Sequence, residues 1–457
     1  MVYLRELFKL TRRWETIRKW LKPGLGIKRW LVVAIAGILL LVNGIDRYLV
    51  AVGYNVHANE LIDGFVDDYF SPSWLKWIFM AVGIALIFVG IRQWLLAILR
   101  ASAVGGSDRI LDTLYEMRLR SGYKIVAIGG GTGLSTLLRG LKRKTTNLTA
   151  VVTVSDDGGS SGRLQRELGV LPPGDVRNCL VALADDEAMV TDLFRYRFHE
   201  GEGLTGHSFG NLFLAAMTGI TGNFDRAIKE SSRVLNIKGR VLPSTLGIVR
   251  LCARLADGTV VEGESTISTS KQPIRQVFFD PPYAAPLGEV ITAIREADAI
   301  ILGPGSLYTS ILPNFLVDRI AREVAASQAV KMYVCNVMTQ PGETDNMTAA
   351  DHVEALLENA GARVCDCVIV NDEPPSKLLE AYAVEGQLPV QPDIERITTM
   401  GLTPMRAQVI SETATVRHDP EKLAQVVIAT IDRSIAQRAS YMRPAQLYEQ
   451  RSPSATG

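Results

Sequence analysis

Two long apolar runs lie near the start of the chain, and shorter apolar runs follow further along. Residues 30–45 contain one polar break, Asn43, and residues 77–91 contain none. With long flanking side chains that can reach the membrane surface, each run attains the roughly 20 residues that cross a bilayer. Neither run has the polar face of a helix on a globular core. We therefore predict transmembrane helices over residues 30–49 and 74–99.

Two alternatives to this membrane hairpin stay open at the level of the sequence. One is a buried helical hairpin, and the other is a signal peptide. A signal peptide fits poorly, because nearly thirty residues precede the first apolar run and a second run follows it.

Basic residues orient the predicted hairpin. Nine Lys or Arg residues precede Trp30, whereas residues 46–73 contain only Arg47 among five acidic residues. Because basic segments stay on the cytoplasmic side, residues 50–73 are predicted to form an extracytoplasmic acidic loop. The predicted localisation is a multi-pass protein of the bacterial cell membrane, with its N-terminus and main domain in the cytoplasm. The basic arm, residues 1–29, either lies on anionic lipid or is an untethered tail.

Beyond the hairpin, residues 100–122 are predicted to form a linker helix, and strand-like runs then alternate with helical patterns. Continuous runs rich in Val and Ile are typical of parallel strands buried on both faces. The fold class predicted for residues 123–440 is therefore α/β, with a mostly parallel sheet and helices on both faces. A flexible tail is predicted for residues 441–457.

The predicted elements follow from these periodicities. The predicted strands cover residues 125–128, 148–154, 299–302, 330–337, 364–370 and 407–410. The predicted helices cover residues 134–141, 175–183, 211–220, 224–235, 287–296, 317–326, 350–359 and 421–435. Residues 248–267 predict a hairpin that turns at Asp257-Gly258.

The most informative turn follows the strand predicted at residues 125–128. Four glycines occur within residues 129–133, and a helical pattern begins immediately afterwards. Bare amides at such a turn, aimed by a helix N-terminus, bind phosphate oxygens. The turn is not a P-loop, because no Lys-Ser or Lys-Thr follows the glycines. It is not a dinucleotide fingerprint, because Leu134 stands where the last glycine would be. A βα turn without a ligand is the alternative. The predicted phosphate-binding residues are Gly129, Gly130, Gly131, Thr132, Gly133 and Ser135.

Polar loops follow other predicted strands at the same edge of the sheet, where open α/β sheets bind ligands. Asp156 and Asp157 could hold a ribose, a Mg²⁺ ion or an attacking hydroxyl, or they could simply cap the turn. Asp175 could likewise cap its helix, with Arg177 and Asn178 reaching the ligand. The further phosphate-binding or ligand-orienting candidates are Ser155, Gly303, Gly305, Ser306, Tyr308 and Asn336.

Residues 206–210 match the nucleophile-elbow pattern of α/β hydrolases, with Ser208 as nucleophile and His352 or His418 as base. An elbow needs a strand directly before it, and the preceding residues are typical of a loop. We therefore predict instead that His207, Ser208 and Asn211 line a helix N-terminus that faces the ligand.

Composition excludes several other classes. The net charge is +1 and no basic and aromatic stripe is present, so we predict no nucleic-acid partner. Five scattered cysteines favour a reducing compartment over a disulfide framework. The five histidines lack paired ligand spacing, so neither zinc nor haem is predicted, and Mg²⁺ is the candidate cofactor.

Six motifs together resemble the CofD-like superfamily, in particular its YvcK or gluconeogenesis factor branch. They are GGGTGLS at Gly129, TVSDDGGSSGRL at Thr153, PPGDVRNCL at Pro172, GHSFGNL at Gly206, LGPGSLYTSILPN at Leu302 and YVCNVMTQPGETD at Tyr333. The resemblance implies a Rossmann-like domain that binds nucleotide sugars of the UDP-N-acetylglucosamine type. It also implies a regulator of cell shape, cell-wall precursor supply and growth on gluconeogenic carbon, and it is compatible with a homodimer.

The sister branch implies the alternative activity. There a 2-phospho-L-lactate transferase uses Mg²⁺ and a nucleotide diphosphate donor. In this chain Asp156 and Asp157 would then be the catalytic and metal-binding residues. The chain departs from the soluble members of the family in its two apolar N-terminal runs.

Overall fold

The computed structural model describes residues 27–51, 74–102, 117–185, 187–270, 272–373, 379–412 and 415–449. The chain divides into two compact units, Met1–Glu116 and Met117–Gly457. Most of the predicted basic arm, nearly all of the acidic loop and most of the linker helix lie outside the described residues.

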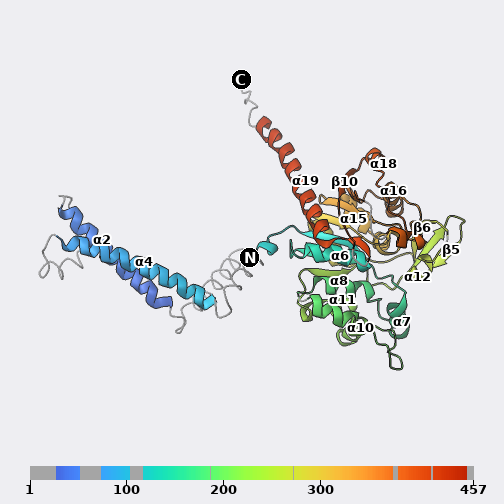
Figure 1. The fold of residues 1–457 in the computed structure, drawn as a ribbon, viewed down its shortest axis with the longest axis horizontal. Coiled ribbons are helices and arrows are strands. Elements are labelled where there is room, and N and C mark those ends of the chain that lie inside the picture. The colour runs from blue at the N-terminus through green and yellow to red at the C-terminus, as the bar shows by residue number, and fades with distance from the viewer. Residues whose placement is uncertain are drawn as a thin grey trace, which may run out of the picture. The chain divides into compact units, whose positions relative to one another are not determined.

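The first unit is a pair of helices, α2 (Ile27–Ala51) and α4 (Leu75–Ser102), that pack along one another (Figure 1). A Cβ atom added to Gly37 would lie 2.8 Å from the carbonyl oxygen of Gly83, and one added to Gly90 would lie 2.8 Å from the amide nitrogen of Ala34. The two backbones therefore approach more closely than larger residues would allow, as small residues permit at helix interfaces.

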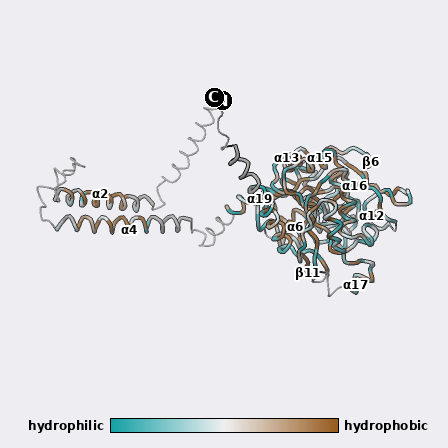
Figure 2. The backbone as a smooth tube through the Cα atoms, turned by 90° about the horizontal axis from the view of Figure 1, so that it is seen from above, coloured by the Kyte–Doolittle hydropathy of each residue, from teal (hydrophilic) through white to brown (hydrophobic). Residues whose placement is uncertain are grey.

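Large apolar side chains point outward from this helix pair, and Figure 2 colours stretches of both helices as hydrophobic. Among the described residues, no helix combines the length and the apolarity that a membrane crossing requires. The transmembrane predictions for residues 30–49 and 74–99 are not confirmed. The exposed side chains include Val32, Ile35, Ile38, Leu39, Val82, Ile84, Phe88 and Ile91.

The second unit is built on a seven-stranded parallel sheet with strand order β10-β9-β8-β7-β1-β2-β3. The first strand lies inside the sheet, with Ile125 paired to Leu148 on one side and to Ala299 on the other. The strands are β1 (Ile125–Gly129), β2 (Leu148–Val152), β3 (Arg240–Pro243), β7 (Ala299–Leu302), β8 (Val330–Val334), β9 (Cys367–Asn371) and β10 (Thr403–Ala407).

Helices cover both faces of this sheet, because alternate residues of each strand point to opposite faces. Ile125 and Ala127 pack into the core with α6 (Gly131–Leu141), α8 (Gly174–Leu183) and α19 (Pro420–Glu449). Val126 and Ile128 pack into the other core, with α13 (Gly288–Glu296), α15 (Ile320–Ala326) and α16 (Ala349–Ala360). The remaining helices are α7 (Gly159–Leu168), α9 (Glu187–Arg195), α10 (Phe209–Thr221), α11 (Phe224–Val234), α12 (Glu264–Ile267), η1 (Leu307–Ile311), α14 (Leu312–Leu316), α17 (Leu379–Val384) and α18 (Ile394–Thr399).

The structure confirms the α/β fold class and the mostly parallel sheet with helices on both faces. Two small antiparallel sheets accompany it: β4 (Arg250–Leu255) pairs with both β5 (Val260–Glu262) and β6 (Ile274–Asp280), and β11 (Ile410–Glu412) pairs with β12 (Val416–His418). The first of these contains the predicted hairpin.

Three local predictions differ from the structure. The strand predicted at residues 407–410 is divided, because β10 ends at Ala407 and β11 begins at Ile410. Strands β3 and β6 escaped prediction; β3 has only four residues, and β6 mixes exposed and buried positions irregularly. Helix α19 continues to Glu449, beyond the predicted start of the tail at residue 441.

Close packing of α6 against α19 generates a stability prediction. A Cβ atom at Gly140 would lie 1.9 Å from the backbone oxygen of Pro420. We expect Gly140→Ala to destabilise the domain by about 1–3 kcal/mol, as overpacked cores do. The measurement is thermal or denaturant unfolding.

Gly219→Ala is the matched control, because a Cβ atom there meets no atom within 4 Å. In the last turn of α10 this change should leave stability unaltered or raise it by up to about 1 kcal/mol. Equal effects of the two alanines would contradict the packing argument.

Candidate functional site

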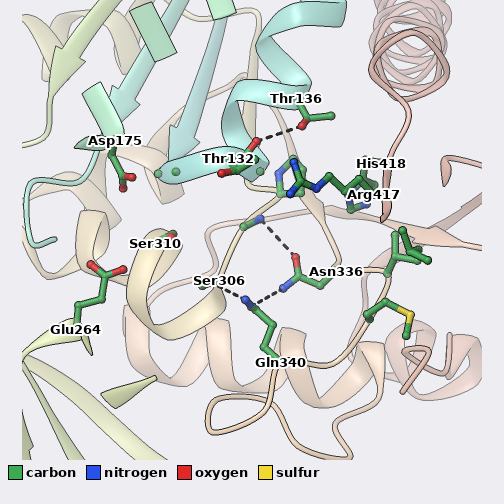
Figure 3. A pocket seen from close by; sticks show the side chains of 18 residues that line it. Thr132, Thr136, Asp175, Glu264, Ser306, Ser310, Asn336, Gln340, Arg417 and His418 are labelled. Atoms are coloured by element: carbon green, nitrogen blue, oxygen red, sulfur yellow. Dashed lines mark hydrogen bonds between the residues drawn. The ribbon is translucent and has the colours of Figure 1, made fainter. Parts of the chain in front are cut away.

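The loops that follow β1, β7 and β8 meet at the carboxyl edge of the sheet and enclose a cavity of about 370 Å³ (Figure 3). A Cβ atom at Gly133 would lie 2.4 Å from the carbonyl oxygen of Pro304 and 2.9 Å from the Cα atom of Gly305. The glycine turn after β1, residues 129–133, and the glycine turn after β7, residues 303–306, therefore approach one another through their backbones. We call them the first and third glycine turns. Of the predicted site residues, the cavity is lined by Gly130, Gly131, Thr132, Gly133, Asp175, Gly305, Ser306 and Asn336.

The first turn has the geometry of a phosphate cradle. Gly131 has φ +61°, a left-handed conformation that favours glycine, and α6 begins at this residue. A Cβ atom at Gly130 would collide with the Asp175 carboxyl, at 2.3 Å. The Ser135 hydroxyl donates to the Gly131 carbonyl over 2.9 Å, so it supports the turn from the buried side of the helix. The amides of the first turn of α6 have no carbonyl partner within the helix, which is the feature that anion-binding helix N-termini share.

Side chains from the loop after β8 hold the third turn in place. The Gly305 amide donates to the Asn336 Oδ1 atom over 3.4 Å, and the Gln340 Nε2 atom donates to the Ser306 hydroxyl over 2.8 Å (Figure 3). Tyr308 lies away from the cavity: its buried hydroxyl donates to the Ile274 carbonyl over 3.4 Å, and burial raises its pKa to about 12. Gly303 directly follows β7 and begins the turn, and its amide donates to the Ile128 carbonyl over 2.8 Å.

Two acidic side chains lie on one side of the cavity, and Arg417 and His418 lie on the other (Figure 3). Burial, followed by the charge of Asp156, raises the pKa of Asp175 to about 7, although the Gly131 amide opposes the rise. Burial and then Asp175 raise the pKa of Glu264 to about 9. Near neutral pH, Glu264 is therefore protonated and Asp175 is partly so, which limits the repulsion of an anionic ligand.

Asp156 and Asp157 direct oxygens toward protein groups. The Asp156 Oδ1 atom accepts from the Gly158 amide over 2.9 Å. The Asp157 Oδ1 atom accepts from the Ser265 amide and hydroxyl, at 3.0 and 2.8 Å, which ties this loop to α12. Ser155 pairs with the Thr153 hydroxyl over 2.9 Å. Within the described part of the chain no group of three or more His, Cys, Asp or Glu side chains is placed to hold a metal, and a Mg²⁺ site stays a prediction.

The predicted polar residues of α8 and α10 form a network beside the cavity. The Arg177 Nη1 atom donates to the Ser208 hydroxyl over 2.7 Å and to the Asn211 Oδ1 atom over 2.9 Å, and its Nη2 atom donates to the Asn178 Oδ1 atom over 2.9 Å. The His207 Nδ1 atom pairs with the Ser160 hydroxyl over 2.9 Å.

This network argues against the nucleophile elbow. Ser208 is buried and caps α10 by accepting from the Asn211 amide over 3.3 Å. A nucleophile elbow needs a β-strand directly before the serine. Among the described residues, that position has only an isolated β-bridge between Arg197 and Ser208. The histidine beside it, His207, is paired with Ser160 instead. Ser208 is the N-cap of α10. His207, Ser208 and Asn211 are not among the residues that line the cavity, so their predicted role in orienting a ligand stays a prediction.

Several cavity residues were not predicted to line the ligand site, and among them His418 was considered only as the base of a hydrolase. Arg417 and His418 belong to the three-residue strand β12, which carries no recognisable periodicity. Glu264 lies in a four-residue helix that only tertiary structure brings to the cavity. Burial lowers the pKa of His418 to about 4, so its ring is neutral at physiological pH. Gln340 lies in the motif that begins at Tyr333, but the sequence did not predict that this residue lines the cavity.

The fold and the cavity define an α/β protein with a phosphate-type site at the strand ends. The family described as 2-phospho-L-lactate transferase CofD matches residues 125–410, and the chain belongs to this family.

Two relatives within this family carry gluconeogenesis factor names, and a solved structure shares the fold. A Bacillus subtilis protein named "Gluconeogenesis factor" is 54% identical over 307 residues, 67% of this chain and 97% of its own. A Nostoc sp. protein named "Putative gluconeogenesis factor" is 49% identical over 418 residues, 90% of this chain and 91% of its own. A crystal structure of a UPF0052 family member from Bacillus halodurans matches with a TM-score of 0.65 and 47% identity, over 67% of this chain and 99% of that chain.

The raised pKa of Asp175 generates a prediction of pH dependence. An acid that is protonated when folded and ionised when unfolded makes the folded state less stable as pH rises from its unfolded value, 3.8, to its folded value, about 7. We expect wild-type stability to fall relative to Asp175→Asn by up to about 1.4 kcal/mol per pH unit between pH 5 and 7. Denaturant unfolding of both proteins measures the difference, and parallel pH profiles would contradict it.

Proposed function

We propose that this protein binds a nucleotide sugar and acts as a regulator of the gluconeogenesis factor type. The observation that carries the proposal is the backbone contact between the first and third glycine turns, at Gly133 and Gly305. It gathers the amides of α6 and the Ser306 turn around one cavity. Such a site suits a pyrophosphate, whose charge is spread over several oxygens.

The rest of the cavity suits the uncharged parts of a nucleotide sugar. Its volume of about 370 Å³ lies in the range of small-molecule sites. Val337, Met338 and Val416 supply an apolar portion, while Asn336 and Gln340 supply amide groups. A ligand of the UDP-N-acetylglucosamine type has both the anionic and the neutral polar groups that these surroundings complement.

A regulatory role is supported by the relatives' names. It is also supported by the hydrogen bonds that engage the carboxylates of Asp156 and Asp157 within the protein. The proteins from Bacillus subtilis and Nostoc carry gluconeogenesis factor names, and Asp157 is engaged by Ser265. Binding would report nucleotide-sugar supply to the machinery of cell-wall precursor synthesis and cell shape.

The alternative is a transferase of the 2-phospho-L-lactate type. The description of the matching family favours it. It would need Mg²⁺ and a nucleotide diphosphate donor, with Asp156 or Asp157 released from its present hydrogen bonds to hold the metal.

Binding without turnover is the expected outcome of the deciding experiment. Purified protein is incubated with UDP-N-acetylglucosamine and Mg²⁺; calorimetry measures binding, and chromatography measures released UMP. Gly133→Ala should weaken binding at least tenfold, because its Cβ atom would push the two glycine turns apart. Gly219→Ala should bind as the wild type does.

Two outcomes would overturn parts of this proposal. Equal affinity of the wild type and Gly133→Ala would remove the cradle as the binding site. Release of UMP that Asp156→Asn abolishes would establish the transferase in place of the regulator.

We also propose that the first unit attaches the protein to the cell membrane, with the second unit in the cytoplasm. Exposed side chains such as Ile35, Leu39 and Phe88 give α2 and α4 an apolar surface that water solvates poorly. The match to the Nostoc relative covers 90% of this chain and the match to the Bacillus subtilis relative covers 67%, so the two relatives differ in how much of the chain they share.

Fractionation of cells tests this attachment. The full chain should sediment with membranes and resist washing with high salt, because apolar contact is not screened by ions. A variant that lacks residues 1–116 should stay in the supernatant and still bind UDP-N-acetylglucosamine. A full-length protein that remains in the supernatant would contradict the attachment.

A further inference from the structure

One serine hydroxyl at the cavity has no partner within the described part of the protein. Ser310 lies in η1, the π-helical turn that follows the third glycine turn, and it lines the cavity (Figure 3). Only 8% of its surface is exposed, and no described residue forms a hydrogen bond with its Oγ atom. A hydroxyl removed from water without a partner costs free energy, and a ligand in the cavity would offset that cost.

The geometry of η1 explains why this hydroxyl is unbonded. A serine in a helix commonly donates to the carbonyl four residues earlier, as Ser135 of α6 does to Gly131 over 2.9 Å. For Ser310 that carbonyl belongs to Ser306, which already accepts the amides of Ser310 and Ile311, each over 3.0 Å. Both lone pairs of the carbonyl oxygen are therefore used. The π-helical turn, a form frequent at functional sites, thus leaves the hydroxyl to the cavity.

Ser310 lies between the first and third glycine turns. A Cβ atom placed on Gly131 would lie 4.0 Å from the Ser310 Oγ atom, and one placed on Gly305 would lie 3.5 Å from the Ser310 Cβ atom. The hydroxyl is therefore close to the turn that begins α6. The preceding residue, Thr309, uses its own hydroxyl to donate to the buried Glu343 Oε1 atom over 2.9 Å. Of these two hydroxyls, only that of Ser310 lines the cavity.

Asn314 of α14 joins this part of η1 to the first glycine turn. Its Nδ2 atom donates to the Ser310 carbonyl over 2.9 Å and to the Gly129 carbonyl over 3.2 Å. Its Oδ1 atom is buried without a partner among the described residues, a cost that a leucine of similar shape would not carry. The Gly129 carbonyl also accepts the Thr153 amide over 3.0 Å, so its pairing does not depend on Asn314. The Asn314 amide is therefore suited to placing η1 rather than to stabilising the fold.

We propose that the Ser310 hydroxyl donates a hydrogen bond to the pyrophosphate of the nucleotide ligand, and that Asn314 is the positioning residue that aims it. This inference rests on the proposed function and assigns a side-chain donor to its anionic group. A hydrogen bond to a charged oxygen is stronger than one between neutral groups. Asp175 and Glu264 lie on the same side of the cavity (Figure 3), so a hydroxyl donor there helps phosphate oxygens to approach this wall.

Calorimetry on the full-length protein with UDP-N-acetylglucosamine and with UDP tests the assignment. UDP keeps the pyrophosphate and lacks the sugar. We expect Ser310→Ala to weaken the binding of both ligands about tenfold, because each loses the same hydrogen bond. Thermal unfolding without ligand should be unchanged, since the hydroxyl bonds to no described residue. Ser232→Ala is the matched control: the Ser232 hydroxyl donates to the Ile228 carbonyl on α11 over 2.7 Å, and the variant should bind both ligands as the wild type does.

A double-mutant cycle tests the role of Asn314. Asn314→Leu should weaken UDP-N-acetylglucosamine binding severalfold in the wild-type background and much less in the Ser310→Ala background, because one residue acts through the other. Equal losses in the two backgrounds would show that Asn314 does not act through Ser310. If the leucine variant does not fold, Asn314→Ala gives the same comparison.

The outcomes separate this inference from the proposed function. A loss of affinity for UDP-N-acetylglucosamine alone would place Ser310 at the sugar and overturn its assignment to the pyrophosphate. Unchanged affinity of Ser310→Ala for both ligands would overturn the inference, whereas weaker binding by Gly133→Ala would leave the proposed function standing. A wild-type protein that binds neither ligand would overturn both.

Discussion

The close approach of two glycine turns is the constraint on which the binding cavity depends. Gly133 at the start of α6 approaches the backbone of Pro304 and Gly305 after β7 so closely that a Cβ atom at Gly133 would lie 2.4 Å from the Pro304 carbonyl oxygen. Their parent strands are neighbours in a parallel sheet, so both turns emerge at the same edge. Any Cβ atom at Gly133 would separate the turns and reduce the cavity's ability to surround an anion.

Buried polar side chains keep these turns in position. The Asn314 Nδ2 atom donates to the carbonyls of Gly129 and Ser310, at 3.2 and 2.9 Å, and so joins the end of β1 to η1. The Glu343 Oε1 atom accepts from the Thr309 and Ser268 hydroxyls, at 2.9 and 3.1 Å. Such contacts fix the backbone of the turns in advance, and a preorganised backbone lowers the entropic cost of binding a ligand of the proposed kind.

The electrostatics of the cavity rest on dipoles and on two acids whose pKa burial raises. Asp175 and Glu264 stand near the glycine cradle, yet burial raises the pKa of both carboxyls. Arg417 faces them across the cavity. The arrangement allows carboxyl groups to shape the wall and donate hydrogen bonds without repelling phosphate as strongly as two carboxylates would.

Periodicity and turn chemistry in the sequence determined the α/β class, most strands of the parallel sheet and the glycine-rich phosphate turns, because buried strands and tight turns impose local residue choices. Gly130, Gly133 and Ser306 were predictable for that reason. Only the tertiary structure decided that Glu264, Arg417 and His418 share the cavity and that Asp157 binds Ser265, since these contacts join residues far apart in the chain.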